Sequence, residues 1–235
     1  MKLNLPLLAA AALAASAQIV AAGDVTGKVT LKGTPKAEIP IDLGPACGKI
    51  NPNKATTRHY VTGKDGALAN VFVYIKDAKK APAAGEAPIL DQVGCMYEPY
   101  IMGVVAGQKF KVRNSDSEMH NVHATPDAKS GNPEFNFGQP VKGQVNEKSF
   151  PNPEVLVRLK CDVHPWMFAY VGVVDHPYFA VTDKDGSFKI SGLPDGKYTI
   201  VAYHLKTHGK TSEGVVKTIE VKGGATQDFT VELAQ

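Results

Sequence analysis

The sequence predicts an all-β protein built from two β-sandwiches. Hydrophobic residues recur at every second position in many short segments, which is the period of a strand with one buried face. Gly, Pro, Asn and Asp bound these segments at regular spacing, which is typical of sandwiches and barrels. After the first 22 residues, the sequence shows no period of 3.6 residues that would predict a long amphipathic helix.

Five strand patterns precede residue 175. They are residues 25–32 (VTGKVTLK), 71–76 (VFVYIK), 109–114 (KFKVRN), 155–161 (VLVRLKC) and 170–174 (YVGVV). Residues 77–90 are rich in Ala and Pro, and together with residues 127–133 they are expected to form surface loops. We assign residues 23–175 to the first domain.

The second domain is predicted over residues 176–235, where alternating segments follow one another with only short turns between them. Asp185-Gly186 and Asp195-Gly196 each lie between alternating segments, which is a strong hairpin signal. The run DKDGSFKISGLPDGKYTIVAYH (183–204) resembles the carboxypeptidase-regulatory-like, or transthyretin-like, module. That resemblance implies a small β-sandwich and says little about function.

The N-terminus has the pattern of a secretory signal peptide over residues 1–22. Lys2 is followed by an apolar run and by two small-residue cleavage sites, after Ala17 or after Ala22. A membrane span is the alternative, but the run is short for the roughly 20 apolar residues that a span needs. We therefore expect export to the periplasm and no membrane span in the mature chain.

The charge balance does not favour a nucleic-acid partner. Residues 1–22 hold one charge, Lys2, so 26 − 1 = 25 basic residues face 23 acidic ones in the remaining chain. Basic residues such as Lys109, Lys111 and Arg113 alternate along a strand, which is typical of a solvated sheet face. A net charge this small predicts no polyanionic ligand.

The chain has three cysteines, Cys47, Cys95 and Cys161. In an oxidising compartment an odd number leaves one thiol for another role. If Cys161 binds a metal, Cys47 and Cys95 are left to form a disulfide. Two buried thiols are the alternative.

The segment KCDVHPWM (160–167) predicts a metal site. It holds a thiol, an imidazole and a thioether at Cys161, His164 and Met167, where a strand must end and the chain must turn. A second imidazole is available upstream in MHNVHATP (119–126), from either His120 or His123. Residues i and i+3 of a strand point to opposite faces, so we expect one of the two to enter the site. Two His and one Cys also suit zinc, but a thioether is a poor zinc ligand.

Together these segments resemble the blue copper proteins of the cupredoxin family, which are Greek-key β-sandwiches, and most of all the amicyanin-type branch. In that branch an HNVH segment follows a strand, and a short C-x2-H-P-aromatic-M loop comes later. The resemblance implies that one type 1 copper is held by His120, Cys161, His164 and Met167. It makes His123 a non-ligand and implies that Asn121 ties the two ligand loops together.

The resemblance covers residues 95–175 well and residues 23–94 only loosely. It implies a non-enzymatic carrier of single electrons that serves redox proteins such as a periplasmic dehydrogenase or a c-type cytochrome. An apolar patch of Pro165, Trp166 and Phe168 would dock the partner, although Trp166 could simply pack in the core. Two alternatives stay open: a copper chaperone or storage protein, and a binding module with a carbohydrate-binding-like C-terminal fold.

Overall fold

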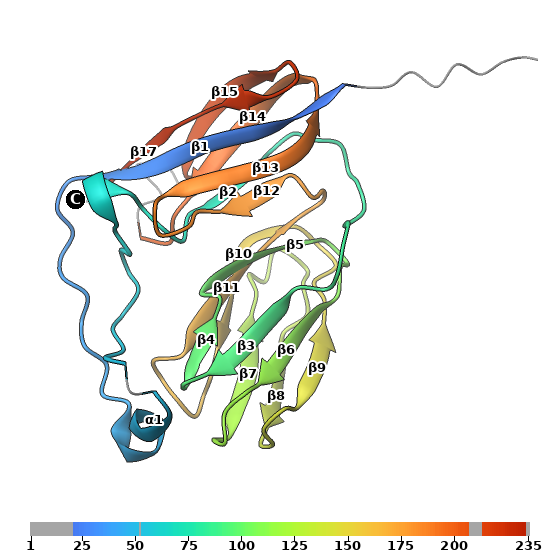
Figure 1. The fold of residues 1–235 in the computed structure, drawn as a ribbon. Helices are drawn as coiled ribbons and strands as arrows, with labels where there is room; N and C mark the ends of the chain where they lie inside the picture. The colour runs from blue at the N-terminus through green and yellow to red at the C-terminus, as the bar shows by residue number, and fades with distance from the viewer. Residues whose placement is uncertain (1–20, 52, 207–212, 234–235) are drawn as a thin grey trace, which may run out of the picture.

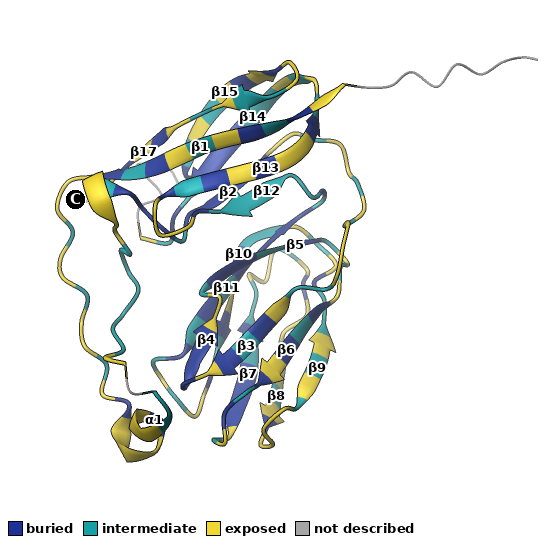
Figure 2. Cartoon of the chain, viewed as in Figure 1, coloured by how far each residue is buried: buried dark blue, intermediate teal, exposed yellow. Residues whose placement is uncertain are grey.

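The computed structural model describes residues 21–51, 53–206 and 213–233, and nearly all of its regular structure is strand. Along many strands buried residues alternate with more exposed ones, as the sequence predicts, whereas several central strands are buried at consecutive positions (Figure 2). The all-β prediction is confirmed. The predicted signal segment lies outside the described residues, except for Ala21 and Ala22. In the part of the chain that the structure describes, no helix is both long and apolar enough to cross a membrane.

The first sandwich contains two sheets and a single core. The five-stranded sheet has the order β5 (Ile101–Val105), β11 (Phe168–Val174), β10 (Glu154–Lys160), β7 (His120–Thr125) and β8 (Phe135–Gln139). The facing sheet has the order β4 (Met96–Glu98), β3 (Ile89–Val93), β6 (Phe110–Asn114) and β9 (Val145–Lys148). Phe110, Phe150 and Leu159 are among the fully buried residues between them.

The second sandwich lies above the first in Figure 1 and also has two sheets. One contains β13 (Ser187–Pro194), β1 (Ala22–Lys32), β16 (Ala225–Thr226) and β17 (Phe229–Glu232). The other has the order β12 (Phe179–Val181), β2 (Phe72–Ile75), β14 (Gly196–Tyr203) and β15 (Val215–Val221). Val29, Ile190 and Ile200 belong to the core between them.

This arrangement differs from the predicted division at residues 175 and 176. Strand β1 pairs with β13 and β17, and β2 pairs with β12 and β14, so both N-terminal strands belong to the second sandwich. The sequence shows that a segment alternates, but it does not show which distant strand will pair with it. The two predicted Asp-Gly hairpins are not formed as hairpins of paired strands, for the same reason. Each Asp-Gly turn joins strands of opposite sheets, β12 to β13 and β13 to β14.

Between β1 and β2 the chain makes a long excursion, residues 33–71, which we call the strap. It leaves the second sandwich, runs along the first to the short helix α1 (Gly44–Ile50), and returns through a 3₁₀ turn, η1 (Lys64–Gly66) (Figure 1). The two legs are joined near α1, where Ile41 N donates to Ala55 O at 2.9 Å. Pro45 stands in the first turn of α1, a position that favours Pro because no backbone donor is needed there.

The two sandwiches contact each other through aromatic residues. Phe72 of β2 is fully buried, and its ring packs near that of Phe179 with 5.7 Å between the centroids. Opposite them Gly103 and Gly172 are register partners in the parallel pair of β5 and β11. A Cβ at Gly172 would lie 2.4 Å from the Phe72 ring, so the missing side chains make room for the rings.

Gly172→Val is therefore expected to destabilise the protein, because the added side chain must displace the Phe72 ring. Overpacking of this kind costs about 1–3 kcal/mol. Chemical unfolding measures the loss, and Gly138→Val is the matched control. Gly138 also lies in a strand, but its nearest neighbour is the end of the flexible Met119 side chain, at 3.7 Å. Equal losses for the two variants would contradict this account of the interface.

Candidate metal centre

Two segments of the first sandwich supply the predicted ligands. His120 is the first residue of β7, and Cys161 directly follows β10. The loop after Cys161 is tight, because Met167 N donates to His164 O at 2.9 Å and Cys161 N donates to Met167 O at 3.1 Å. Strands β7 and β10 are antiparallel neighbours, so the start of one lies beside the end of the other. This register brings His120 and Cys161, which are 161 − 120 = 41 positions apart, to one end of the sandwich.

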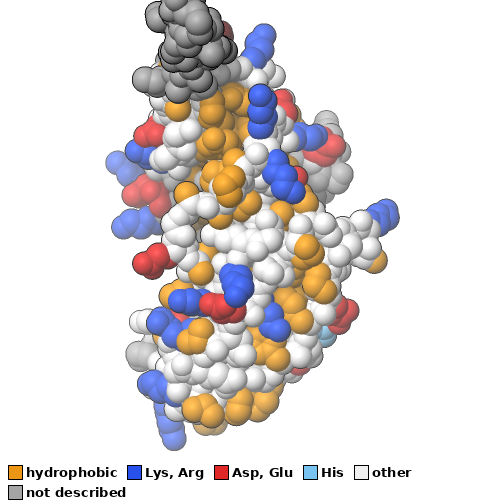
Figure 3. Space-filling view, turned by 90° about the vertical axis from the view of Figure 1, so that its right-hand side faces the viewer, with side chains coloured by type: hydrophobic (Ala, Val, Ile, Leu, Met, Phe, Trp, Pro, Cys, Tyr) orange, Lys and Arg blue, Asp and Glu red, His pale blue; other side chains and the backbone are white. Residues whose placement is uncertain are grey.

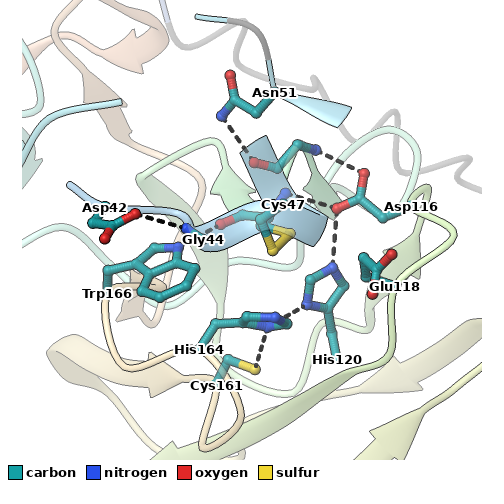
Figure 4. The surroundings of a disulfide bond; sticks show 12 residues. Asp42, Gly44, Cys47, Asn51, Asp116, Glu118, His120, Cys161, His164 and Trp166 are labelled. Atoms are coloured by element: carbon teal, nitrogen blue, oxygen red, sulfur yellow. Dashed lines mark hydrogen bonds and ion pairs between the residues drawn. A yellow bond between two sulfur atoms is a disulfide. The ribbon is translucent and has the colours of Figure 1, made fainter. Parts of the chain in front are cut away.

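Three of the predicted ligand atoms converge. His120 Nδ1 and His164 Nδ1 lie 3.1 Å apart, and Cys161 Sγ lies 3.7 Å from His164 Nδ1 (Figure 4). One ligand atom from each of the three residues lies within 4.8 Å of the others. His120 is 0% exposed and Cys161 is 2% exposed. Met167 is fully buried in the same core, but its place as the fourth ligand stays a prediction.

His123 points away from this cluster. Its Nδ1 lies 2.9 Å from Asp162 Oδ2, and its Nε2 lies 2.8 Å from Glu134 Oε1, both on the solvent side of the sheet. The structure therefore brings one of the two upstream histidines into the cluster, His120, as the alternation along a strand requires.

Asn121 lies between the two ligand segments. Its side-chain oxygen accepts hydrogen bonds from Asp162 N at 2.7 Å and from the Cys161 thiol at 3.3 Å. Its backbone oxygen accepts one from the buried Tyr97 hydroxyl at 2.6 Å. The residue thus connects β7 to the loop that follows β10, and its role beside a metal stays a prediction.

Asp116 is a residue that sequence reasoning missed. Its carboxylate is 5% exposed and receives hydrogen bonds from Gly94 N at 2.7 Å, Cys95 N at 2.8 Å and His120 Nε2 at 2.9 Å. Because Nε2 donates to the carboxylate, the lone pair of the neutral His120 ring is on Nδ1, which faces His164. In the sequence the only signal was an Asp four residues before a histidine, in a stretch that reads as a polar loop.

The cluster shifts the pKa values of its own members. Burial disfavours the charged His120 ring, but hydrogen bonds to Asp116 and Cys161 outweigh burial and raise its pKa to about 9. Burial raises the pKa of the Cys161 thiol. The hydrogen bond from His120 and nearby backbone donors lower the same pKa by a larger amount, so the net shift is downward. Burial and the charge of His120 lower the pKa of His164. These interactions make the Cys161 thiol easier to ionise, and a thiolate is the form that binds metals.

The predicted disulfide between Cys47 and Cys95 is present, with 5.7 Å between the Cα atoms. Cys47 is the buried residue of α1, so the bridge fastens the strap to the first sandwich. Its position was not predicted. The two sulfur atoms and a His164 ring nitrogen lie within 4.8 Å of one another, so the bridge lies directly beside the ligand cluster (Figure 4).

The strap also reaches the predicted docking residues. Pro165 is exposed, whereas Trp166 and Phe168 are half-buried. The Trp166 ring lies 5.3 Å from that of His164, and its Nε1 donates to Cys95 O at 3.0 Å. All three residues line a cavity of about 270 Å³ whose other walls include strap residues Ile41 and Thr56–His59. Trp166 thus supports the ligand loop, and whether the three residues dock a partner stays a prediction.

The donor set fits a soft or borderline metal ion. Metal–nitrogen and metal–thiolate bonds are about 2.0–2.3 Å long, so ligand atoms 3.1 and 3.7 Å apart can share one ion without large movements. Two imidazoles and one thiolate suit both copper and zinc. A buried thioether on the same loop favours copper, because zinc rarely takes that ligand.

No family model and no curated protein match the chain. Solved structures with partial similarity include an oxidised mutant of amicyanin, at 22% identity and a TM-score of 0.34, covering 43% of this chain and 97% of that one. The Cu(I) form of another amicyanin mutant matches at 23% identity and a TM-score of 0.32, over the same shares of the two chains. The Cu-containing nitrite reductase from Thermus scotoductus SA-01 matches at 16% identity and a TM-score of 0.34 over 42% of this chain. The match spans 25% of the reductase.

Asp116→Asn is expected to weaken metal binding by roughly 10–100-fold, which is typical when the residue that orients a ligating His is lost. An amide cannot accept from all three donors, so His120 loses its fixed tautomer. Competition with a chromophoric chelator measures the affinity. Glu118→Gln, two residues along the same loop, is the control and should bind as the wild type does. Equal affinity for both variants would exclude this role for Asp116.

Proposed function

We propose that the protein is a type 1 copper protein that carries single electrons, with copper held by His120, Cys161, His164 and Met167. The observation that carries this proposal is the convergence of two imidazole nitrogens and a buried thiol within 4.8 Å. Copper bound by this set would supply a one-electron couple, because thiolate and thioether favour Cu(I) and imidazole serves both oxidation states.

Burial of the cluster supports a carrier over an enzyme. His120, Cys161 and Met167 are at most 2% exposed, so little surface is open to a substrate. Asp116 and Asn121 hold the ligand segments from outside the cluster, which keeps the ligands in place when the charge changes. Such a site suits electron transfer, because the transfer is fast when the ligands move little between the two oxidation states of the metal.

We place this activity in the periplasm, where an N-terminal signal peptide would deliver the chain and a disulfide would persist. The partners would be redox proteins, such as a dehydrogenase that donates electrons and a c-type cytochrome that accepts them. On the face drawn in Figure 3, acidic and basic side chains are interspersed, so neither sign of charge dominates that side of the molecule. Docking near Pro165 would place a partner close to the His164 ring.

The copper-loaded protein is expected to show an intense visible thiolate-to-Cu(II) band and a narrow copper hyperfine splitting. Cys161→Ser and His120→Ala should lose both signals. His123→Ala is the matched control, because its ring pairs with Asp162 and Glu134 outside the cluster, and it should keep them. A colourless copper-loaded wild type would refute the proposal.

Met167→Leu tests the fourth ligand separately. A thioether is a weak axial ligand, so its loss should leave the visible band in place and change the reduction potential. Leucine has a similar volume, so the core should stay filled. Voltammetry of the wild type and the variant measures the change. An unchanged potential would remove Met167 from the ligand set.

A further inference from the structure

The disulfide beside the metal centre has no role in the proposed electron transfer. Its two sulfur atoms lie within 4.8 Å of a His164 nitrogen, and the Cys95 sulfur also lies within 4.8 Å of an Asp116 oxygen and a His120 nitrogen. Cys47 is 2% exposed and Cys95 is 0% exposed. A disulfide with a purely structural role would not need to lie beside the two imidazoles. This one is placed where its sulfur atoms meet the ligand imidazoles.

We propose that reduction of this disulfide creates a second soft-metal site, formed by Cys47, Cys95 and His164, which binds Cu(I). A dithiol reductant gives two electrons and two protons, becomes a disulfide itself, and leaves two protein thiols. When Cu(I) binds, each thiol loses its proton and forms a metal–sulfur bond. The inference deepens the proposed function, because the two sites share His164.

The ligand chemistry selects the ion. A disulfide offers no thiolate, whereas two thiolates and an imidazole form a soft set that suits Cu(I). Bonds of about 2.3 Å place three ligands around one ion about 4 Å apart. The nitrogen already lies within 4.8 Å of both sulfur atoms, so the main change is the separation of the two sulfurs.

Helix α1 can accommodate that separation. It has seven residues, and Cys47 is its buried one. A Cβ at Gly44 or at Gly48 would meet no atom within 4 Å, so two of its positions face open space. A short element with one buried side chain opens at low free-energy cost, which also gives a reductant access to the bridge.

The flanks of α1 keep the two thiols near each other after reduction. Asn51 Nδ2 donates to Gly94 O at 2.8 Å, directly beside Cys95. On the other side, the strap legs are joined by the bond from Ile41 N to Ala55 O. Asp116 holds the Cys95 backbone independently of the disulfide. The reduced pair therefore stays beside His164.

Sharing of His164 has a consequence for copper handling. A Cu(I) ion held by Cys161, His120 and His164 can exchange ligands one at a time for Cys95 and Cys47 without leaving the protein. With the disulfide oxidised, copper would stay on Cys161, His120 and His164 and serve electron transfer. With the disulfide reduced, Cu(I) would move to Cys47 and Cys95 under α1, from where it could be released. A reducing dithiol would act as the signal.

Cys161→Ser separates the second site from the first, because it removes the thiol of the blue copper set. We would reduce this variant with a dithiol, remove the reductant, and titrate Cu(I) against bicinchoninate under anaerobic conditions. The reduced variant should bind one Cu(I) at least tenfold more tightly than the oxidised variant. A variant that also carries Cys47→Ser and Cys95→Ser is the matched control and should show no such gain. Adding His164→Ala to Cys161→Ser should weaken the binding.

Equal Cu(I) affinity in the reduced and oxidised forms of Cys161→Ser would overturn the proposal, and so would a gain that persists without the two bridge cysteines. Preference of the reduced form for Zn(II) over Cu(I) would overturn the choice of metal. If Cys161→Ser does not fold, the wild type decides: tighter Cu(I) binding after reduction that is absent when Cys47 and Cys95 are replaced by Ser supports the site, and equal affinity before and after reduction refutes it. The visible band of the oxidised wild type tests the proposed function separately.

Discussion

The Asp116 carboxylate is the group on which the metal end of the first sandwich depends. It is buried, and it gathers the His120 ring and the backbone of Gly94 and Cys95 into one hydrogen-bonded unit. Hydrogen bonds to a charged acceptor contribute about 1.5–3 kcal/mol each, and a buried carboxylate without them would be strongly destabilising. The His120 tautomer, the position of the disulfide and the attachment of the strap therefore all follow from where this carboxylate lies.

The convergence of His120, Cys161 and His164 was predictable because its information is local. Cys161 and His164 are three residues apart at the end of a strand, and a strand pattern that ends in a thiol places that thiol at the edge of a core. The choice of His120 over His123 follows from the alternation of β7 once one face is known to be buried. Predictions from residue spacing and from alternation along one strand do not depend on which strands pair. They therefore remain valid even where the predicted strand pairing is wrong.

Strand pairing and the surroundings of the site were not predictable in the same way. Strand β1 has the same alternation as any strand of the first sandwich, yet its partner β13 lies more than 150 residues away in the chain. The role of Asp116 depends on the turn at Cys95, which is close only because β3 and β6 pair in parallel. The disulfide could be inferred from the number of cysteines, but its contact with His164 depends on the path of the strap.

Because the strap begins and ends in the second sandwich, that sandwich also bears on the surroundings of the candidate metal centre. Both ends of the strap are strands of the second sandwich, whereas its middle carries α1 and Cys47 to the far end of the first (Figure 1). The disulfide fastens α1 to the first sandwich, and because both legs of the strap end in the second one, the separation of the two sandwiches also constrains where the strap runs. Phe72, seated against Gly172, maintains that separation and lies at the very start of β2, where the strap ends. The Phe72 ring at the interface and helix α1 beside His164 thus belong to one continuous stretch of chain.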